Sequence, residues 1–468
     1  MKTIKTTTRY KKLLADTMTP VSLYLRLRDV FANSILLESS DYHGNDNSYS
    51  YICCNPIASF EVKNRQAKTS FPNCTPHYKD ITSKVDFENS LQGFMDSFIS
   101  TDSVPEFIPN GLFGYINYDA VSYFDNFTWD YDQSEIPEVR YSYYEYIVII
   151  NHFKNELYIV QNSYDGEKGD ITSFINHIRS AKNPIYTFDT TGTENSTMKD
   201  EDFLDIVEKC IAHCNRGDVF QIVPSRRFDI SFKGDEFNVY RALRSINPSP
   251  YLFYFDYGSY KIFGSSPEAQ LVIRNNTASI YPIAGTFRRT GDDEKDRIEA
   301  ERLRNDEKEN SEHVMLVDLA RNDLSKSISQ VKVDTFKEIQ FYSHVIHLVS
   351  KVSGKIDDKD NSLSLITETF PAGTLSGAPK HMALELLHKY EPTRRGYYGG
   401  AIGFLGFNGD FNHAIMIRSF FSRENTLYFQ AGAGVVAKSK PENELNEVSN
   451  KLMALRSAIE EAKNINRM

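Results

Sequence analysis

Three apolar and aromatic runs separated by short polar turns make up residues 400–436, GAIGFLGFNGDFNHAIMIRSFFSRENTLYFQAGAGVV. The runs cover residues 400–407, 413–422 and 426–436. Such residues bounded by Asn, Asp and Gly are typical of strands, and short connections favour antiparallel neighbours. The stretch therefore predicts three adjacent antiparallel strands.

Outward from this stretch, residues 20–165 are rich in further strand-like runs, while other segments have helical spacing. Helices are predicted at about 168–182, 203–218, 292–320 and 441–463. The polar segment 183–202 is the best boundary, which predicts an N-terminal region, a connector and a C-terminal region. Their limits are 1–165, 166–200 and 201–468. Strands combined with long helices predict an α+β fold, in which helices cover antiparallel sheets.

Composition narrows the classes of partner. The chain has 468 residues and a net charge of −10, without a Lys/Arg-rich tract, which argues against nucleic acid or an anionic membrane. The basic N-terminus lacks the apolar core of a secretion signal, and no apolar run is long enough to span a bilayer. Five cysteines without a compact framework predict reduced thiols and a cytoplasmic location. Cys210 and Cys214 are interpreted as two thiols on one helix face, because no second Cys/His pair suits a metal.

Two predicted helices each carry a pair of glutamates three residues apart, so each pair shares one helix face. The pairs are Glu309 with Glu312, and Glu444 with Glu447. Four carboxylates are ligands that Mg²⁺ prefers, which makes a metal site one interpretation. The alternative is an acidic, solvated helix face, with first-turn acids favoured by the helix dipole and Glu447 paired with Lys451.

Four further features allow either a functional or a structural interpretation. Gly432 and Gly434 flank Ala433 within a strand-like run, where they form either a bulge or a carboxylate-binding backbone. An arginine in an apolar strand is an edge residue or a carboxylate clamp, and a histidine in an apolar segment is a core residue or an acid–base group. A lysine also begins the helix after a Gly/Pro/Ser loop. These three residues are Arg418, His347 and Lys380.

Taken together and in order, nine motifs resemble the chorismate-utilising enzymes, specifically the anthranilate synthase component I family. The motifs are GSSPEA, PIAGT, SEHVMLVDLARND, HLVSKVSG, GTLSGAPK, YGGAIG, IRS, QAGAGVV and NELNEVSNK. They match densely over about residues 200–460 and more loosely before that, chiefly through LLES at 36–39. The resemblance implies two large packed antiparallel β-sheets with helices on the outside.

The resemblance also implies a set of site residues. Those implied to bind chorismate are Gly285, Thr286, Tyr398, Lys380, Arg418, Gly432, Ala433 and Gly434. Those implied to hold Mg²⁺ are Glu312 and Glu447, with Glu309 and Glu444 close by. Those implied to take part in catalysis are Glu268, His347, Thr286 and Gln221. Arg288 and Arg289 are expected in a mobile surface loop.

The implied reaction adds ammonia at ring carbon 2 while the 4-hydroxyl leaves, and then expels pyruvate to give anthranilate. Hydroxide is a poor leaving group, so a general acid is needed, and Glu268 matches the family's acid. Sister enzymes that use water carry a lysine base where this chain has Gln221. Aminodeoxychorismate synthases often carry a nucleophilic lysine where this chain has Ala284. Both differences favour anthranilate; aminodeoxychorismate synthesis and a catalytically dead tryptophan-sensing subunit stay as alternatives.

Two further motifs, LLES and NPSPYLFY, resemble the family's tryptophan-binding segments. They imply feedback inhibition by L-tryptophan through Glu38, Ser39, Pro250, Tyr251 and Leu252. The alternative is that they are a strand end and a turn. No segment places a nucleophilic Cys in a Gly-x-Cys-x-Gly context, so a separate glutamine amidotransferase subunit is expected to supply ammonia.

Overall fold

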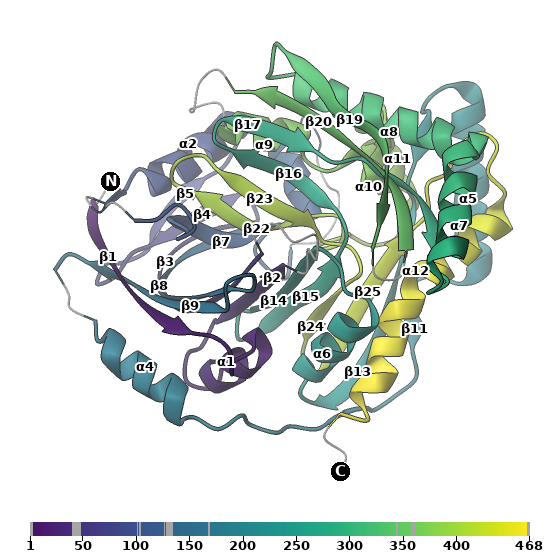
Figure 1. Ribbon diagram of the computed structural model, residues 1–468. Helices are drawn as coiled ribbons and strands as arrows, with labels where there is room; N and C mark the ends of the chain where they lie inside the picture. The colour runs from purple at the N-terminus through teal and green to yellow at the C-terminus, as the bar shows by residue number, and fades with distance from the viewer. Residues whose placement is uncertain are drawn as a thin grey trace.

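The computed structural model describes residues 3–39, 48–100, 102, 104–125, 127, 134–166, 169–342, 345–356 and 362–465. Its strands form extended, almost entirely antiparallel sheets, and the helices lie around the outside (Figure 1). The predicted α+β class is therefore confirmed. None of the helices in these ranges is long and apolar enough to cross a membrane.

Two long strands, β3 (Tyr49–Lys63) and β8 (Val139–Asn151), pair with each other and start two arms of sheet. The first arm continues from β3 through β2 (Ile35–Ser39), β14 (Tyr251–Asp256), β15 (Tyr260–Ser266), β24 (Ser419–Arg423), β25 (Thr426–Gly432) and β13 (Ser225–Gly234). The second arm continues from β8 through β7 (Gly111–Ile116), β22 (Ala401–Gly406), β23 (Phe411–Ile415), β16 (Ala269–Arg274), β17 (Thr277–Ile280) and β20 (Val345–Lys355). Strand β20 also pairs with β18 (Ile283–Arg288) and β19 (Val331–Phe341).

The stretch 400–436 connects the two arms. Strands β22 and β23 form a hairpin in the second arm, whereas β24 and β25 form a hairpin in the first. The predicted single strand over 413–422 is therefore wrong, because the chain leaves β23 and enters β24 through a break at residues 416–418. Arg418 has a left-handed backbone there, with φ of 47°, which ends regular strand geometry.

Shorter strands complete the sheets. Strand β1 (Ile4–Leu14) pairs antiparallel with β9 (Glu156–Tyr164), which lies beside β8, and β6 (Phe98–Ser100) adds a parallel pair to β1. The remaining strands are β4 (Gln66–Ser70), β5 (His77–Asp80), β10 (Phe188–Thr190), β11 (Asn195–Ser196), β12 (Gln221–Ile222) and β21 (Gly377–Ala378). The run VFQIVPSRRFDISF at residues 219–232 is typical of one strand by composition, but the structure divides it into β12 and β13, since Pro224 between them cannot donate a ladder hydrogen bond.

The N-terminal helices are α1 (Pro20–Leu27), α2 (Lys84–Met95), the 3₁₀ turn Tyr118–Ala120, α3 (Val121–Phe124) and α4 (Ile171–Ser180). Those that follow are α5 (Asp200–Arg216), α6 (Phe237–Ile246), α7 (Asp293–Asn305), α8 (Glu307–Ser325), α9 (Ser362–Thr369), α10 (Gly373–Ser376), α11 (Lys380–Tyr390) and α12 (Pro441–Ala462). The one long helix predicted at 292–320 is instead α7 and α8. They divide at Asp306, whose extended backbone ends α7 and whose carboxylate accepts from the Glu309 amide at 3.0 Å to cap α8.

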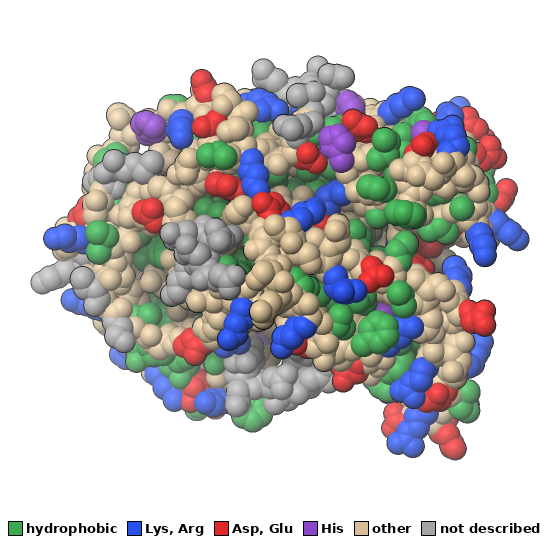
Figure 2. Space-filling view, turned by 90° about the horizontal axis from the view of Figure 1, so that it is seen from above, with side chains coloured by type: hydrophobic (Ala, Val, Ile, Leu, Met, Phe, Trp, Pro, Cys, Tyr) green, Lys and Arg blue, Asp and Glu red, His purple; other side chains and the backbone are tan. Residues whose placement is uncertain are grey.

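The hydrophobic core includes residues from both sides of the predicted boundary segment 166–200. One apolar cluster packs Leu23 and Phe174 with Leu455 of α12, and strand pairs β2–β14 and β7–β22 join residues before 165 to residues after 201. The spacing of Leu445, Val448, Leu452, Leu455 and Ile459 predicts an apolar stripe on the last helix; the last four are buried, and Leu445 is partly buried against the same cluster. Figure 2 shows acidic and basic side chains interspersed over one face of the molecule.

Candidate active site

The turn in PIAGT begins the site. Strand β18 has a bulge between Ala284 and Thr286, and Gly285 there adopts φ of 64°. A Cβ atom on Gly285 would lie 2.5 Å from Leu303 Cδ1 and 3.3 Å from Glu309 Oε2. Glycine is therefore required at this turn, and Glu309 reaches it from α8. The Thr286 backbone pairs with His347 in the neighbouring strand; its side chain lies outside the described structure.

His347 faces the same turn from β20. Its Nδ1 lies 2.9 Å from the Gly285 carbonyl oxygen, which can only accept a hydrogen bond. Burial lowers the imidazole's pKa, so the neutral ring donates from Nδ1 and carries its lone pair on Nε2. The side chain thus has the protonation state of a base and a fixed orientation.

The two glutamate pairs face each other from α8 and α12. Burial raises the pKa of Glu309 and Glu312, and the charge of Glu447 on α12 adds to both effects. Burial and Glu447 likewise raise the pKa of Glu444. Across the described ranges, no three His, Cys, Asp or Glu groups are already clustered tightly enough to hold a metal ion. The pairs therefore form an acidic face of repelling carboxylates rather than a compact ligand set.

Glu268 lies just before β16 and has few compensating contacts. Burial raises the pKa of its carboxyl to about 7. The Thr374 hydroxyl of α10 donates to Glu268 Oε1 at 3.1 Å and opposes the shift, as do the positive charges of Arg418 and Lys451. A carboxyl with this pKa can carry a proton near neutral pH, as a general acid must.

Arg418 lies opposite, in the break between β23 and β24. Its guanidinium enters no hydrogen bond or ion pair with any residue that the structure describes. Burial lowers its pKa, while the charges of Glu268 and Tyr398 raise it. A desolvated guanidinium without an internal partner is suited to bind an incoming carboxylate through two parallel hydrogen bonds.

Gly432 is the last residue of β25 and lies beside Tyr398, on which Arg418 also acts. A Cβ atom there would lie 2.7 Å from the Pro224 carbonyl oxygen, so the close pairing with β13 requires glycine. Burial raises the pKa of Tyr398 to about 12, whereas Arg395, the Gly432 amide and Arg418 lower it, which places its hydroxyl at this backbone. Lys451 of α12 donates to the Gly432 carbonyl at 2.9 Å and pairs with Glu447 at 2.8 Å.

Three other predicted residues have their contacts within the protein. Gln221 covers Gly434, because a Cβ atom on that glycine would lie 2.8 Å from Gln221 Nε2. The buried Ala433 donates its amide to the Pro224 carbonyl at 3.2 Å. Lys380 donates to the Thr369 carbonyl at 2.9 Å and pairs with Asp323 at 3.3 Å. Binding of chorismate by Ala433 and Lys380 stays a prediction.

The sequence interpretation missed Thr374 and left Lys451 only as a partner of Glu447. Thr374 carries no spacing signal of its own, since its role depends on α10 folding against the start of β16. Lys451 had a usable signal: it lies four residues after Glu447 and so shares its helix face. Arg289 does not lie in a free loop, because its Nε donates to the buried Asp296 of α7 at 2.8 Å; the exposed Arg288 ends β18.

A second group of predicted residues lies in the first arm. Strands β2 and β14 pair so that Glu38 is opposite Leu252 and Ser39 is opposite Tyr251, with Pro250 adjacent. Glu38 is 5% exposed. Its carboxylate accepts from Arg244 Nε at 2.9 and 3.1 Å and from the Tyr240 hydroxyl at 2.7 Å. The two motifs thus form one surface although more than 200 residues separate them.

Comparisons with known proteins show the family and the fold. A family model described as chorismate binding enzyme matches residues 33–457. Anthranilate synthase component 1 of Aquifex aeolicus is 36% identical over 96% of this chain and 94% of its own length; that of Acetivibrio thermocellus is 35% identical with the same coverage. The crystal structure of anthranilate synthase component I from Streptococcus pneumoniae superposes with a TM-score of 0.78 at 28% identity, covering 95% of this chain and 99% of that one. An isochorismate synthase of Escherichia coli, at 18% identity and a TM-score of 0.73, shares the fold.

Proposed function

Because this chain belongs to the chorismate binding enzyme family, we propose that it is an enzyme converting chorismate and ammonia to anthranilate and pyruvate, the first committed step of tryptophan biosynthesis. Relatives named anthranilate synthase component 1 support the product. Two groups carry the proposal: Glu268, a carboxyl with a pKa of about 7, and the nearby guanidinium of Arg418, which makes no hydrogen bond or ion pair with the described residues.

In this proposal Arg418 binds the enolpyruvyl carboxylate through its two-pronged guanidinium. Tyr398 and the Gly432 backbone complete the contact from the other side, and Lys451 fixes that backbone by holding the Gly432 carbonyl. Gly285 would line the ring's site beside β18, where the absence of a side chain lets Leu303 and Glu309 approach the backbone. These contacts supply orientation, which lowers the barrier by holding the reacting atoms close together.

The acidic face of α8 and α12 fits a divalent cation in its donor chemistry. Its carboxylates are hard oxygen ligands, and their mutual repulsion is what a cation would relieve. Glu312 and Glu447 would hold Mg²⁺, with Glu309 and Glu444 beside them. The bound ion would neutralise the ring carboxylate of chorismate.

Glu268 supplies the proton for the first step. Ammonia attacks ring carbon 2, the double bond shifts, and the bond to the 4-hydroxyl breaks as Glu268 protonates the leaving oxygen. The ring then loses the proton on carbon 2 and expels pyruvate, which makes the ring aromatic. His347, neutral and oriented by the Gly285 carbonyl, is assigned to this elimination.

Two positions separate the proposal from related activities. Gln221 covers Gly434 and, unlike lysine, cannot act as a base toward water. Ala284 is buried in β18 immediately before the Gly285 turn and cannot attack the substrate covalently. Aminodeoxychorismate synthesis is therefore the second candidate, and the product decides between the two.

Regulation, partner and location are further parts of the proposal. L-Tryptophan would bind at the β2–β14 surface, where its ammonium group would meet the Glu38 carboxylate that Arg244 now holds. A glutamine amidotransferase subunit would supply ammonia, in keeping with the component naming of the relatives. All five cysteines are free thiols, which supports the cytoplasm as the location.

The first test mixes the purified chain with chorismate, Mg²⁺ and ammonium at alkaline pH, and follows anthranilate fluorescence. Growth of the signal, its loss with EDTA and its recovery with Mg²⁺ are expected. A Glu447→Ala variant should need at least about tenfold more Mg²⁺ for half-maximal rate. An aminodeoxychorismate product would overturn the assignment, and an unchanged rate under saturating tryptophan would remove the regulatory site.

A further inference from the structure

A small pocket adjoins Glu268, between the β16–β17 hairpin and the helices α8 to α10. Its volume is about 30 Å³. Most of its wall is apolar and comes from Ile280, Pro282, Leu316, Leu319, Ala320 and Ala372. One water molecule needs roughly 10–15 Å³ of such space, so the pocket has room for a water but not for a substrate ring.

The polar part of the wall contains an unsatisfied group. Gln270 is 3% exposed, and its amide nitrogen donates to Thr369 Oγ1 at 3.3 Å. Its amide oxygen is buried and accepts no hydrogen bond from any part of the chain that the structure describes. Buried carbonyl oxygens are normally paired with protein or with an ordered water. A small hydrogen-bond donor in the pocket would satisfy this oxygen.

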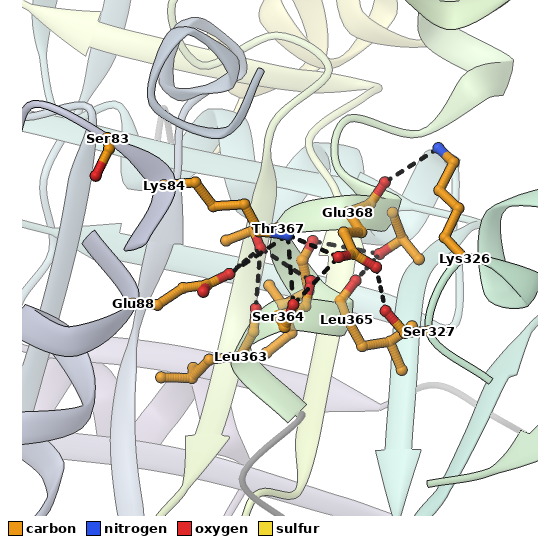
Figure 3. Close-up of polar contacts among 12 residues, drawn as sticks. Ser83, Lys84, Glu88, Lys326, Ser327, Leu363, Ser364, Leu365, Thr367 and Glu368 are labelled. Carbon is orange, nitrogen blue, oxygen red and sulfur yellow. Dashed lines mark hydrogen bonds and ion pairs between the residues drawn. The ribbon is translucent and has the colours of Figure 1, made fainter. Parts of the chain in front are cut away.

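Two carboxyl groups also lie in the wall of the pocket. Glu268, held by Thr374, lies in its wall, and Asp323 lies farther along α8. Asp323 accepts from Lys326 at 3.1 Å, and the Lys326 side chain is 40% exposed. Figure 3 shows Lys326 reaching Glu368 of α9, the helix whose last residue, Thr369, lines the pocket.

We propose that this pocket binds one water molecule and receives the hydroxyl group that chorismate loses. This rests on the proposed function. As the carbon–oxygen bond breaks, its electron pair stays on oxygen and the Glu268 carboxyl transfers its proton to that oxygen, which forms water. The ammonium group formed at carbon 2 gives up one proton to solvent, and solvent returns one proton to the Glu268 carboxylate. The new water thus forms beside a pocket that has room for it, with Gln270 as acceptor.

The direct test is a crystal structure of the whole chain without substrate, at a resolution that shows ordered water. One water bonded to the Gln270 amide oxygen is expected; a dry pocket would overturn the proposal. This result does not depend on turnover. If the chain forms no anthranilate, the proposed function fails, whereas the density in the pocket is judged separately.

A kinetic test uses Gln270→Met, which removes the acceptor at nearly constant volume. We expect kcat to fall about tenfold or more with little change in the KM for chorismate, since proton handling changes and binding does not. A folded variant with the wild-type kcat would contradict the proposal.

Two threonines of α9 provide a matched pair in case Gln270→Met does not fold. Both donate to carbonyl oxygens within their helix, but only Thr369 lines the pocket. Thr369→Val should lower kcat several-fold more than Thr367→Val. Equal effects of the two substitutions would show that the pocket has no part in the reaction.

Discussion

Two glutamates, the buried Glu38 in one arm of the sheet and the partly buried Glu268 in the other, have opposite surroundings. Glu38 of β2 receives three hydrogen bonds, two from Arg244 and one from Tyr240. Glu268, before β16, receives one from the side chain of Thr374, while Arg418 acts on it only through its charge. The same residue type is therefore fully compensated at one end of the molecule and only partly at the other.

The difference separates structural from chemical use of a carboxyl group. A carboxylate with several hydrogen-bond donors fixes its neighbours, as Glu38 fixes α6 against β2 through Tyr240 and Arg244. A poorly compensated one has a pKa shifted toward the working pH, which is useful to a general acid and unfavourable to stability. Arg418 shows the same pattern from the cationic side: burial lowers its pKa, and no carboxylate among the described residues forms an ion pair with its guanidinium.

The largest effect is expected for Glu268→Gln. Removal of the acid should lower kcat by about 10²–10⁴, with the KM for chorismate nearly unchanged, in the anthranilate assay. Burial raises the folded-state pKa of Glu268, so ionisation of this carboxyl lowers the stability of the folded protein as pH rises through about 7. At pH 8 the variant should therefore unfold in urea at no lower concentration than the wild type. A kcat close to that of the wild type would remove Glu268 from the mechanism.

Arg418→Met should act on binding. Loss of a charge-assisted contact worth about 1.5–3 kcal/mol predicts a KM for chorismate about 10- to 150-fold higher. Arg418→Lys should recover part of the loss, because a lysine keeps the charge but not the two-pronged geometry. If both variants bind chorismate as the wild type does, the substrate carboxylate lies elsewhere.

Much of this comparison could be predicted from the sequence. The α+β class, the strand character of residues 400–436 apart from the break at 416–418, and the apolar stripe of α12 follow from local periodicity. The association of LLES with NPSPYLFY follows from their resemblance to the family's tryptophan-binding segments. The β2–β14 register places the two motifs side by side. These features depend on short-range patterns or on whole motifs.

The features that could not be predicted depend on packing between residues far apart in the sequence. Nothing local to Arg418 shows that the chain changes sheets there, because its neighbours are as apolar as those of a continuous strand. The bond from Thr374 to Glu268 joins residues 106 positions apart. The division of α7 from α8 at Asp306 was readable in principle, since Asp three residues before Glu309 is a capping pattern. Charged residues continue with helical spacing on both sides of Asp306, so the pattern also fits one uninterrupted helix.

The pH profile should show the raised pKa directly. A general acid must be protonated, so kcat/KM for chorismate, at a fixed concentration of free NH₃, should fall above pH of about 7, by about tenfold per unit. The Thr374 hydroxyl lowers the pKa of Glu268, so Thr374→Val should move this fall to higher pH. Thr374→Ser, which keeps the hydroxyl, should not. A fall at the same pH in both variants would mean that another group controls the profile.

The smallest effect should occur at the compensated end. Among the described donors, Arg244→Met leaves the buried Glu38 carboxylate with the Tyr240 hydroxyl alone, which should lower the free energy of unfolding by about 1–3 kcal/mol in urea. Arg241→Met, on the same helix, is the control; its guanidinium bonds Asn238 rather than a carboxylate, so a change within about 0.5 kcal/mol is expected. Turnover without tryptophan should stay near wild type in both, because neither arginine lies near Glu268. Glu268→Gln would then lower activity but not stability, whereas Arg244→Met would lower stability but not activity. A loss of kcat in Arg244→Met that matches its loss of stability would show that the two ends of the molecule are coupled.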